Sequence, residues 1–379
     1  MPAVAIRGAG VRCALGADVA ACSAALLAGG KPPARTTLAG LAEASEVAYY
    51  RIDDGHELFD PGRFGRLLPG VVQDAVASLS AAERQRLPLF IGSSCFSIGQ
   101  SETGYAAALA RSQAQAYPMP HCGYDWLASL VRQAIGSGGA SYTFNTACTS
   151  SANAIMGACR ALQAGLYRHA LVLGAELANL TTLSGFSGLQ LLSDRVLPFE
   201  VGREGLVLGE GIGAVLLSVE GPPDAIRLHG GANNCDTFSV TTADPEGTSV
   251  AAVLRQSLAQ AGLGPEAIQG IKAHGTGTPS GDLAEAAGLR KAFPELPPFS
   301  VLKPHIGHTL GACGVIELVL YAGALAQGRL PARPGPVTAD PELGIQALSV
   351  SRAAPRGYYL LNQFGFGGNN TVLVLEKPT

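Results

Sequence analysis

The chain has 379 residues, of which 47 % are hydrophobic and 15 % are charged, and its formal net charge is −3. A chain of this length and apolar content can bury a large core, which excludes a small binding module and a disordered chain. No run of lysines or arginines interleaves with aromatic residues, so nucleic-acid binding is excluded as well. The opening MPAVAIRGAG lacks the pattern of a secretory signal, and no apolar stretch reaches the length of a membrane span. We therefore expect a cytoplasmic protein.

The eight cysteines form no CxxC pair and have no regular spacing. This distribution argues against a disulfide framework and against a zinc site, so no metal is expected. Most of these cysteines are expected to be small core residues.

The predicted elements alternate between strands and helices in chain order. Strands are predicted at residues 88–94, 141–147, 169–176, 206–219, 225–229, 269–274, 299–302 and, as a pair, within 358–376, and helices after Cys148 and at 249–261. Thr248 is expected to cap the second of these helices and Gly262 to end it. The alternation predicts an α/β fold. The Gly-Pro-Pro at 221–223 is the best boundary between a half of residues 1–221 and a half of residues 222–379.

Cys148 follows a β-branched and aromatic run, SYTFNTA, and precedes a helical apolar spacing. It is therefore expected in a strand-to-helix turn. The free N–H groups and the positive dipole end of a helix N-terminus favour a thiolate and can hold an oxyanion. The pattern indicates a nucleophile, although an arbitrary cysteine is more often a buried core residue.

The segment AHGTGTPSGDLAEA places His274 at the end of a predicted strand. Asp282 is expected to cap the helix that follows, and Glu285 lies one turn further along. A single histidine in such a turn is usually structural. A catalytic role for His274 is therefore indicated only together with the segment that contains Lys303 and His308.

In VLKPHIGHTLGACG a predicted strand ends at Lys303, and the following turn carries His305 and His308. Lysine and histidine beside glycines at a strand end are typical of an active site. Two neutral imidazoles that donate N–H groups to a thioester oxygen would stabilise the enolate formed when a malonyl thioester loses carbon dioxide. A nearby ammonium and carboxylate would set the protonation states. His305 is the weaker candidate for a direct role.

Near the C-terminus, NQFGFGGNN places Phe366 among glycines at 365, 367 and 368. Such glycines allow a loop to turn its N–H groups toward the sulfur or to move as a gate. A bulge in a glycine-rich hairpin is the alternative.

Taken in order, these motifs resemble those of the elongating β-ketoacyl-[acyl-carrier-protein] synthases, a family of acyltransferases. The similar segments are VAIRGAGVRCALG at the start, TACTSSA around Cys148, GREGLVLGEGIGAV at 202–215, HGTGTPSGD, KPHIGHTLGACG and FGFGGNN. The resemblance covers nearly the whole chain. It implies a thiolase-like fold with two similar α/β halves in five layers, αβαβα, which normally forms a dimer.

The resemblance also assigns roles to residues. It makes Cys148 the acylated nucleophile, His274 and His308 the pair that supports decarboxylation, and Lys303 with Glu285 a supporting ion pair. The oxyanion hole would be formed by the backbone N–H groups of Cys148 and Phe366, with Phe366 as the acyl gate. Thr276 and Thr278 would line a tunnel for pantetheine.

The same resemblance implies an acyl carrier protein as partner, substrates held on its phosphopantetheine, and no bound cofactor. By position, Arg63, Arg66 and Arg203 are candidates to contact the carrier protein, although surface arginines are more often simply solvated.

Some residues depart from the family pattern. The chain is short, SDRVLPF at 193–199 replaces a longer loop, and His305 is unexpected. TACTSSA is also similar to synthases of aryl-polyene and related secondary pathways. The acyl substrate stays open, with residues 117–126 as one possible part of the pocket wall.

Two other functions compete with condensation. A degradative thiolase would use coenzyme A and a second cysteine as base, for which Cys313 is a poor substitute. A chain-length-factor-like partner of a heterodimeric synthase commonly lacks the active cysteine, which this chain keeps. We therefore expect an active condensing enzyme, either as a homodimer or as the active member of a heterodimer.

Overall fold

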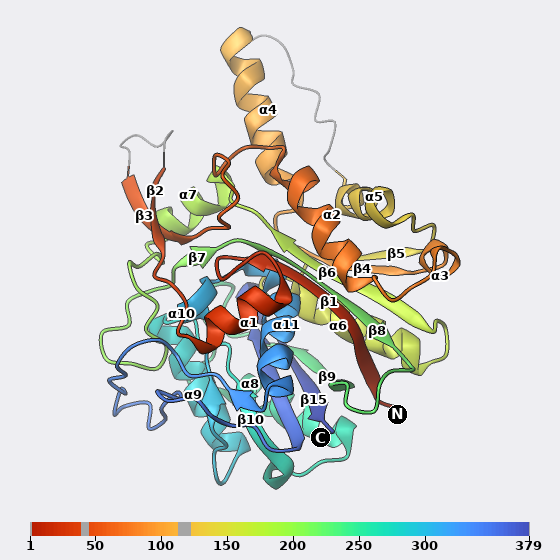
Figure 1. Ribbon diagram of the computed structural model, residues 1–379. Coiled ribbons are helices and arrows are strands. Elements are labelled where there is room, and N and C mark those ends of the chain that lie inside the picture. The colour runs from red at the N-terminus through yellow and green to blue at the C-terminus, as the bar shows by residue number, and fades with distance from the viewer. Residues whose placement is uncertain (1, 39–44, 113–122, 379) are drawn as a thin grey trace.

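The protein, described by a computed structural model over residues 2–38, 45–112 and 123–378, is built on a ten-stranded mixed sheet (Figure 1). The strand order is β11-β10-β14-β15-β9-β1-β8-β6-β4-β5. The first half of the chain contributes β1 (Val4–Cys13), β4 (Leu89–Gly92), β5 (Ser141–Phe144), β6 (His169–Glu176) and β8 (Gly211–Ser218). The second half contributes β9 (Arg227–Cys235), β10 (Ile268–Lys272), β11 (Phe299–Ser300), β14 (Gly357–Phe364) and β15 (Asn369–Lys377).

The two halves of the sheet have the same topology. In the first half β8 is antiparallel to both β1 and β6, while β6, β4 and β5 are parallel. In the second half β15 is antiparallel to both β9 and β14, while β14, β10 and β11 are parallel. The halves join where β1 pairs with β9 through Val4 and Ala5. The strand pattern therefore occurs twice, although the sequence contains no visible repeat, and the proposed boundary after residue 221 falls between β8 and β9.

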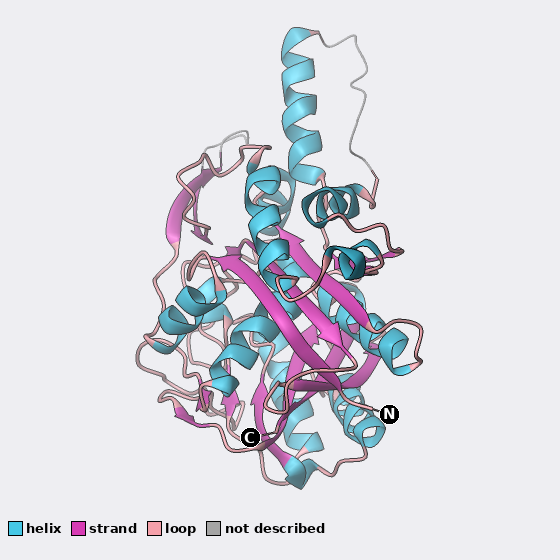
Figure 2. Ribbon diagram, turned by 45° about the vertical axis from the view of Figure 1, so that its right-hand side comes forward, coloured by secondary structure: helices cyan, strands magenta, loops and turns pink. Residues whose placement is uncertain are grey.

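Helices complete five layers. The central layer is α6 (Ser150–Gln163) and α11 (Cys313–Ala326), which share one core with both halves of the sheet. Helices α2 (Arg63–Ala75) and α5 (Trp126–Ile135) cover the outer face of the first half, and α8 (Thr248–Ala261) and α9 (Pro279–Ala292) cover that of the second (Figure 2). The five-layered α/β fold with two similar halves, which the resemblance implied, is confirmed.

Successive side chains of a strand pack against different helix layers, one on each face of the sheet. In β8, Ile212, Ala214 and Leu216 pack toward α2 and α5, whereas Val215 and Leu217 pack into the central layer. Successive residues of a strand point to opposite faces, so a fully apolar strand with helices on both faces is buried on both.

The remaining elements lie around these layers. They are α1 (Val19–Leu27), β2 (Ala34–Leu38), β3 (Ser45–Tyr50), α3 (Ala81–Gln85), α4 (Ile98–Arg111), α7 (Leu180–Gly188), β7 (Leu208–Gly209), α10 (Lys303–Ile306), β12 (Arg329–Leu330) and β13 (Arg352–Ala353), with short 3₁₀ turns at Pro265–Ala267, Leu310–Ala312 and Phe366–Gly368. Helix α4 extends away from the layers at the top of Figure 1.

Several predicted elements differ in detail from those observed; the strand predicted at 225–229, for example, continues to Cys235 as β9. Helix α8 begins at Thr248 with Gly247 as its cap, so Thr248 is not the cap, whereas Gly262 ends the helix as expected. The predicted strand 206–219 is divided into β7 and β8 at Glu210, which turns its side chain into the protein.

Arg63 is the partner of that buried carboxylate. Its guanidinium donates to both oxygens of Glu210, at 2.5 and 2.8 Å, and to Asp54 at 2.8 Å. Glu210 also accepts the N–H groups of Ile52 and Ala178, at 2.8 and 3.1 Å. Because Arg63 is 0 % exposed, its expected contact with a carrier protein is wrong. The Arg63 side chain instead links the start of α2 to Glu210, between β7 and β8.

Arg63→Ala is expected to lower the free energy of unfolding by about 3–5 kcal/mol, because it leaves the Glu210 carboxylate buried without its cation. Urea unfolding followed by circular dichroism would measure the change. Arg66→Ala, on the same helix but with a side chain 41 % exposed, is the matched control and should unfold near the wild-type midpoint. Equal midpoints for the two variants would contradict this account of Arg63.

Candidate active site

Cys148 lies in the turn between β5 and α6, as predicted. Ala147 before it has a positive φ of 52°, which an alanine adopts only where its surroundings impose it. The turn is closed by Thr149, which donates its N–H and hydroxyl to the carbonyl of Thr146, at 3.2 and 2.7 Å. The strained turn thus directs the thiol into a cavity instead of the core.

Burial raises the pKa of the Cys148 thiol to about 11. The charge of Lys303 and the backbone N–H groups of Phe366 and Cys148 act in the opposite direction but do not outweigh burial. The backbone N–H groups at the helix N-terminus thus favour the thiolate, as expected, but in the free protein burial outweighs them. The thiol is protonated at neutral pH, so the reaction must move a proton.

The loop after β14 lies against this thiol. A Cβ atom on Gly365 would be 3.2 Å from the Cys148 nitrogen, so a larger residue would push the loop away. The ring of Phe366 stacks on Phe186 of α7, with centroids 5.8 Å apart and planes at 13°. The backbone N–H groups of Cys148 and Phe366 both hydrogen-bond the sulfur. Their role as an oxyanion hole stays a prediction.

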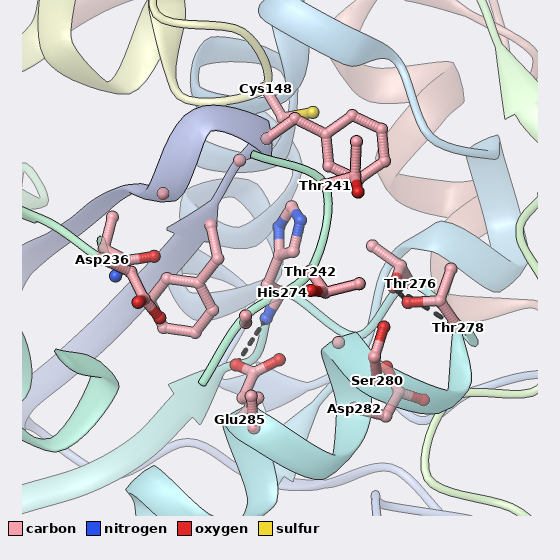
Figure 3. A pocket seen from close by; sticks show the side chains of 18 of the residues that line it. Cys148, Asp236, Thr241, Thr242, His274, Thr276, Thr278, Ser280, Asp282 and Glu285 are labelled. Atoms are coloured by element: carbon pink, nitrogen blue, oxygen red, sulfur yellow. Dashed lines mark hydrogen bonds between the residues drawn. The ribbon is translucent and has the colours of Figure 1, made fainter. Parts of the chain in front are cut away.

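His274 and His308 line the same cavity as Cys148. Their ring centroids are 5.5 Å apart and their planes are nearly perpendicular. In Figure 3, the imidazole of His274 rises from the end of its strand toward Cys148. Burial and the charge of Lys303 lower the pKa of His308 to about 3 and hold that of His274 well below its ordinary value. Both imidazoles are therefore neutral at physiological pH.

Lys303 forms its ion pair with Glu317 of α11, not with Glu285. Its Nζ lies 3.0 Å from Glu317 and 2.7 Å from the carbonyl oxygen of His274. Glu285 instead accepts the N–H groups of His274 and Gly275, both at 2.8 Å. The predicted Lys303–Glu285 pair is wrong: the carboxylate that lies against Lys303 is that of Glu317, and Glu285 accepts from the turn and from Asn362, the latter at 3.1 Å.

A second buried lysine, Lys272 at the end of β10, shares the same carboxylate. It donates to Glu317 and to the carbonyl of Asn362, the latter at 2.7 Å. Neither Lys272 nor Glu317 was singled out from the sequence. Both are single charges in otherwise apolar buried segments, IQGIKA and CGVIELVLYAGALA, and that is the signal that could have found them.

The hydroxyls of Thr276 and Thr278 hydrogen-bond each other at 2.8 Å and line the cavity, as Figure 3 shows. Thr278 caps α9, whereas Asp282, the predicted cap, lies in the first turn and accepts the N–H groups of Phe199 and Gly277, at 2.8 and 3.2 Å. Asp282, in the first turn of α9, therefore holds the two loops that contain Phe199 and Gly277.

Other candidates lie away from the cavity. The Nε2 atom of buried His305 contacts the carbonyl of Ala332 at 2.9 Å, and the residue does not line the cavity. Arg203 is held by Asp340 with 11 % of its side chain exposed, which leaves little surface for a partner, whereas Arg66 is more open. Residues 117–122 of the expected pocket wall lie outside the described residues.

Within the described part of the chain, no group of three or more histidine, cysteine or acidic side chains could hold a metal ion. Over the same residues, no helix combines the length and apolarity needed to cross a bilayer.

Glu317→Gln is expected to lower the free energy of unfolding by about 3–5 kcal/mol, because it leaves two buried ammonium groups without a counter-charge. Glu285→Gln, a matched substitution of a neighbouring buried glutamate, should cost about 1–2 kcal/mol, since it mainly disturbs hydrogen bonds. Chemical denaturation would compare them. A larger loss for Glu285→Gln would restore Glu285 as the partner of Lys303.

Comparison with known proteins agrees with this geometry. Residues 1–220 match the N-terminal domain of the beta-ketoacyl synthase family, and residues 226–335 match its C-terminal domain. The chain is 33 % identical to 3-oxoacyl-[acyl-carrier-protein] synthase 2 of Synechocystis sp. over 64 % of this chain and 63 % of that protein. It is 27 % identical to the synthase 2 of Staphylococcus aureus (strain COL), over 88 % and 87 % of the two chains.

Solved structures give the same result. A chain of the solved complex between the ketosynthase ApeO and its chain length factor ApeC, from Xenorhabdus doucetiae, matches with a TM-score of 0.86 and 26 % identity over 99 % of this chain and 98 % of that one. A beta-ketoacyl synthase from Burkholderia phymatum STM815 matches with a TM-score of 0.82 and 25 % identity over the full length of both chains. The chain therefore belongs to the beta-ketoacyl synthase family.

Proposed function

We propose that this protein catalyses the decarboxylative Claisen condensation of a malonyl thioester with an acyl chain held on Cys148, giving a β-ketoacyl thioester. The observation that carries the proposal is the meeting of a thiol, two backbone N–H donors and two neutral imidazoles in one cavity. The thiol and one N–H donor come from the first half of the chain, while the imidazoles and the other donor come from the second.

In the first step Cys148 attacks the carbonyl carbon of an acyl thioester. The oxygen of the tetrahedral intermediate accepts the N–H groups of Cys148 and Phe366. The bond to the pantetheine sulfur then breaks, and that sulfur leaves with the proton of the Cys148 thiol. The acyl chain remains on the enzyme as a thioester.

In the second step a malonyl thioester loses carbon dioxide and becomes an enolate. His308 is suited to stabilise its oxygen, because the N–H of Leu310 donates to Nδ1 at 3.1 Å and so places the imidazole proton on Nε2. The enolate carbon attacks the acyl carbonyl, the bond to Cys148 breaks, and the sulfur takes up a proton from solvent. The product is longer than the acyl chain by two carbon atoms.

The carrier of both substrates is proposed to be the phosphopantetheine of an acyl carrier protein. The curated relatives are named as acyl-carrier-protein synthases, and Thr276 and Thr278 offer hydroxyls along the cavity. No bound cofactor is needed, because each step uses only side chains, backbone N–H groups and thioesters. Phe366 is proposed as the gate, and the length and type of the acyl chain stay open.

A second subunit is also proposed. Strand β5 ends the sheet, pairs with β4 alone among the described strands, and carries Tyr142 with 41 % exposure. An open strand edge of this kind favours association with another chain. A homodimer and a heterodimer with a chain-length-factor-like homologue both fit. The presence of Cys148 beside His274 and His308 favours the catalytic role over that of the chain-length-factor-like subunit. A cytoplasmic location remains a prediction.

His308→Ala should still become acylated on Cys148 but release carbon dioxide from malonyl carrier protein at least about a hundredfold more slowly, because it loses the enolate donor. Intact-mass spectrometry would detect the acyl adduct, and radioactive carbon dioxide would report decarboxylation. Cys148→Ala is the control and should form no adduct. Loss of acylation in His308→Ala would overturn the assignment, and absence of any adduct on the wild type would argue against the proposed function.

The decarboxylation rate should change by less than about twofold between pH 8 and pH 5.5. The pKa of His308 is about 3, so its neutral form, which dominates above that value, persists throughout this range. An imidazole with the ordinary pKa of about 6.5 would instead lose about tenfold of its neutral form by pH 5.5. Steady-state carbon dioxide release in buffers of constant ionic strength measures the profile. A fall centred near pH 6.5 would contradict the depressed pKa.

A further inference from the structure

Gln363, near the end of β14, connects His274 to the ion-pair cluster. This fully buried side chain places Oε1 3.0 Å from Nδ1 of His274 and Nε2 2.6 Å from Oε2 of Glu317. It was not singled out from the sequence. Both ends of its amide are thus engaged by groups of the active site.

The orientation of this amide is fixed by Glu317. Lys272 and Lys303 both donate to the Glu317 carboxylate and lower its pKa to about 2, so it is ionised and can only accept hydrogen bonds. The opposite orientation would place an amide oxygen 2.6 Å from a carboxylate oxygen, without a proton between them. Nε2 therefore faces Glu317, and Oε1 faces His274.

The orientation of Gln363 determines the tautomer of His274. An amide oxygen only accepts, so Nδ1 must carry the proton that it receives. Lys303 also lies 3.2 Å from Nδ1, but two of its three N–H groups donate to closer acceptors, the carbonyl of His274 at 2.7 Å and Glu317 at 3.0 Å. A lone pair on Nδ1 would face the amide oxygen of Gln363 at 3.0 Å, which disfavours that alternative. The Nε2 atom has no hydrogen-bond partner among the described residues, and the ring lines the cavity.

We propose that Gln363 is a positioning residue that holds the proton of His274 on Nδ1, so that Nε2 enters the cavity as a hydrogen-bond acceptor. The proposal rests on the proposed function for its role in the reaction. His308 has the opposite tautomer, because Nδ1 accepts the N–H of Leu310 and Nε2 carries the proton. The two imidazoles thus form a donor–acceptor pair and not the pair of donors expected from the sequence.

The pair divides the reaction between its members. His308 donates to the thioester oxygen during decarboxylation. His274 lines the same cavity as the Cys148 thiol and, during acyl transfer, would receive the thiol proton on Nε2 and pass it to the departing pantetheine sulfur. The imidazole is neutral before and after the step, and no proton is gained or lost overall.

Nuclear magnetic resonance of the full-length protein labelled with ¹⁵N in its histidine rings tests the tautomers directly. The chain has seven histidines, and His274→Asn and His308→Asn would assign the two sets of ring signals. We expect a protonated, pyrrole-type Nδ1 and a pyridine-type Nε2 in His274, with the reverse in His308. A pyrrole-type Nε2 in His274 of the wild type would overturn the proposal, whether or not any variant folds.

Gln363→Leu tests the link to the reaction. Without the amide oxygen, Lys303 is the remaining partner of Nδ1, so the proton of His274 should move to Nε2. Acylation of Cys148 should then slow by at least about tenfold, while decarboxylation by His308 changes by less than about threefold. An unchanged tautomer, or equal losses in both half-reactions, would contradict the proposal.

Gln327→Leu, the same substitution at an exposed position after α11, is the matched control and should leave the tautomer and both rates unchanged. The ring signals need no substrate. The tautomer can therefore be right where the proposed condensation is wrong, and the two failures are distinguishable.

Discussion

The active site depends on one carboxylate, that of Glu317, which is buried between the ammonium groups of Lys272 and Lys303. Two like charges could not stay ionised in this interior without it, because each loses its hydration on burial. Glu317 comes from α11, Lys272 from β10 and Lys303 from the turn at α10. A single carboxylate thus fixes three elements of the second half relative to one another, and through Gln363 it also fixes β14.

The repeated topology explains why the thiol meets these groups. Strands β5 and β11 occupy equivalent outer positions in the two halves, and each leads into a helix of the central layer, α6 or α11. Cys148 lies between β5 and α6, and Lys303 and His308 lie between β11 and α11. The central helices pack closely, since a Cβ atom on Gly314 would lie 2.3 Å from the nitrogen of Ala152. The close contact of two equivalent helices therefore brings the two turns to one cavity.

The α/β alternation and the turn of Cys148 could be predicted from the sequence, because apolar periodicity and small residues report local structure directly. The partner of Lys303 could not, since Glu285 and Glu317 both lie on helices and only the packing decides which carboxylate faces the ammonium. From the sequence Arg63 is predicted to be a surface residue, because charged side chains are usually exposed. Its carboxylate partner, Glu210, lies far along the chain, so no local pattern indicates the pair. The protonation state of Cys148 likewise depends on how deeply the turn is buried, which no local pattern reports.

The positive charge of Lys303 lowers the pKa of the three reacting side chains, Cys148, His274 and His308. Two ammonium groups face the single carboxylate of Glu317, and, after burial, their charge is a further cause that lowers the pKa of His274 and of His308. The charge of Lys303 also lowers the pKa of Cys148, against the effect of burial. A positive field disfavours an imidazolium and favours an anion, so the imidazoles of the free protein are neutral and a thiolate, an oxyanion or an enolate is stabilised as it forms. A proton received by His274 is readily passed on for the same reason. Two neutral imidazoles can act as one donor and one acceptor only if they carry their protons on different ring nitrogens. In this chain the N–H of Leu310 fixes the tautomer of His308, and the amide of Gln363 fixes that of His274.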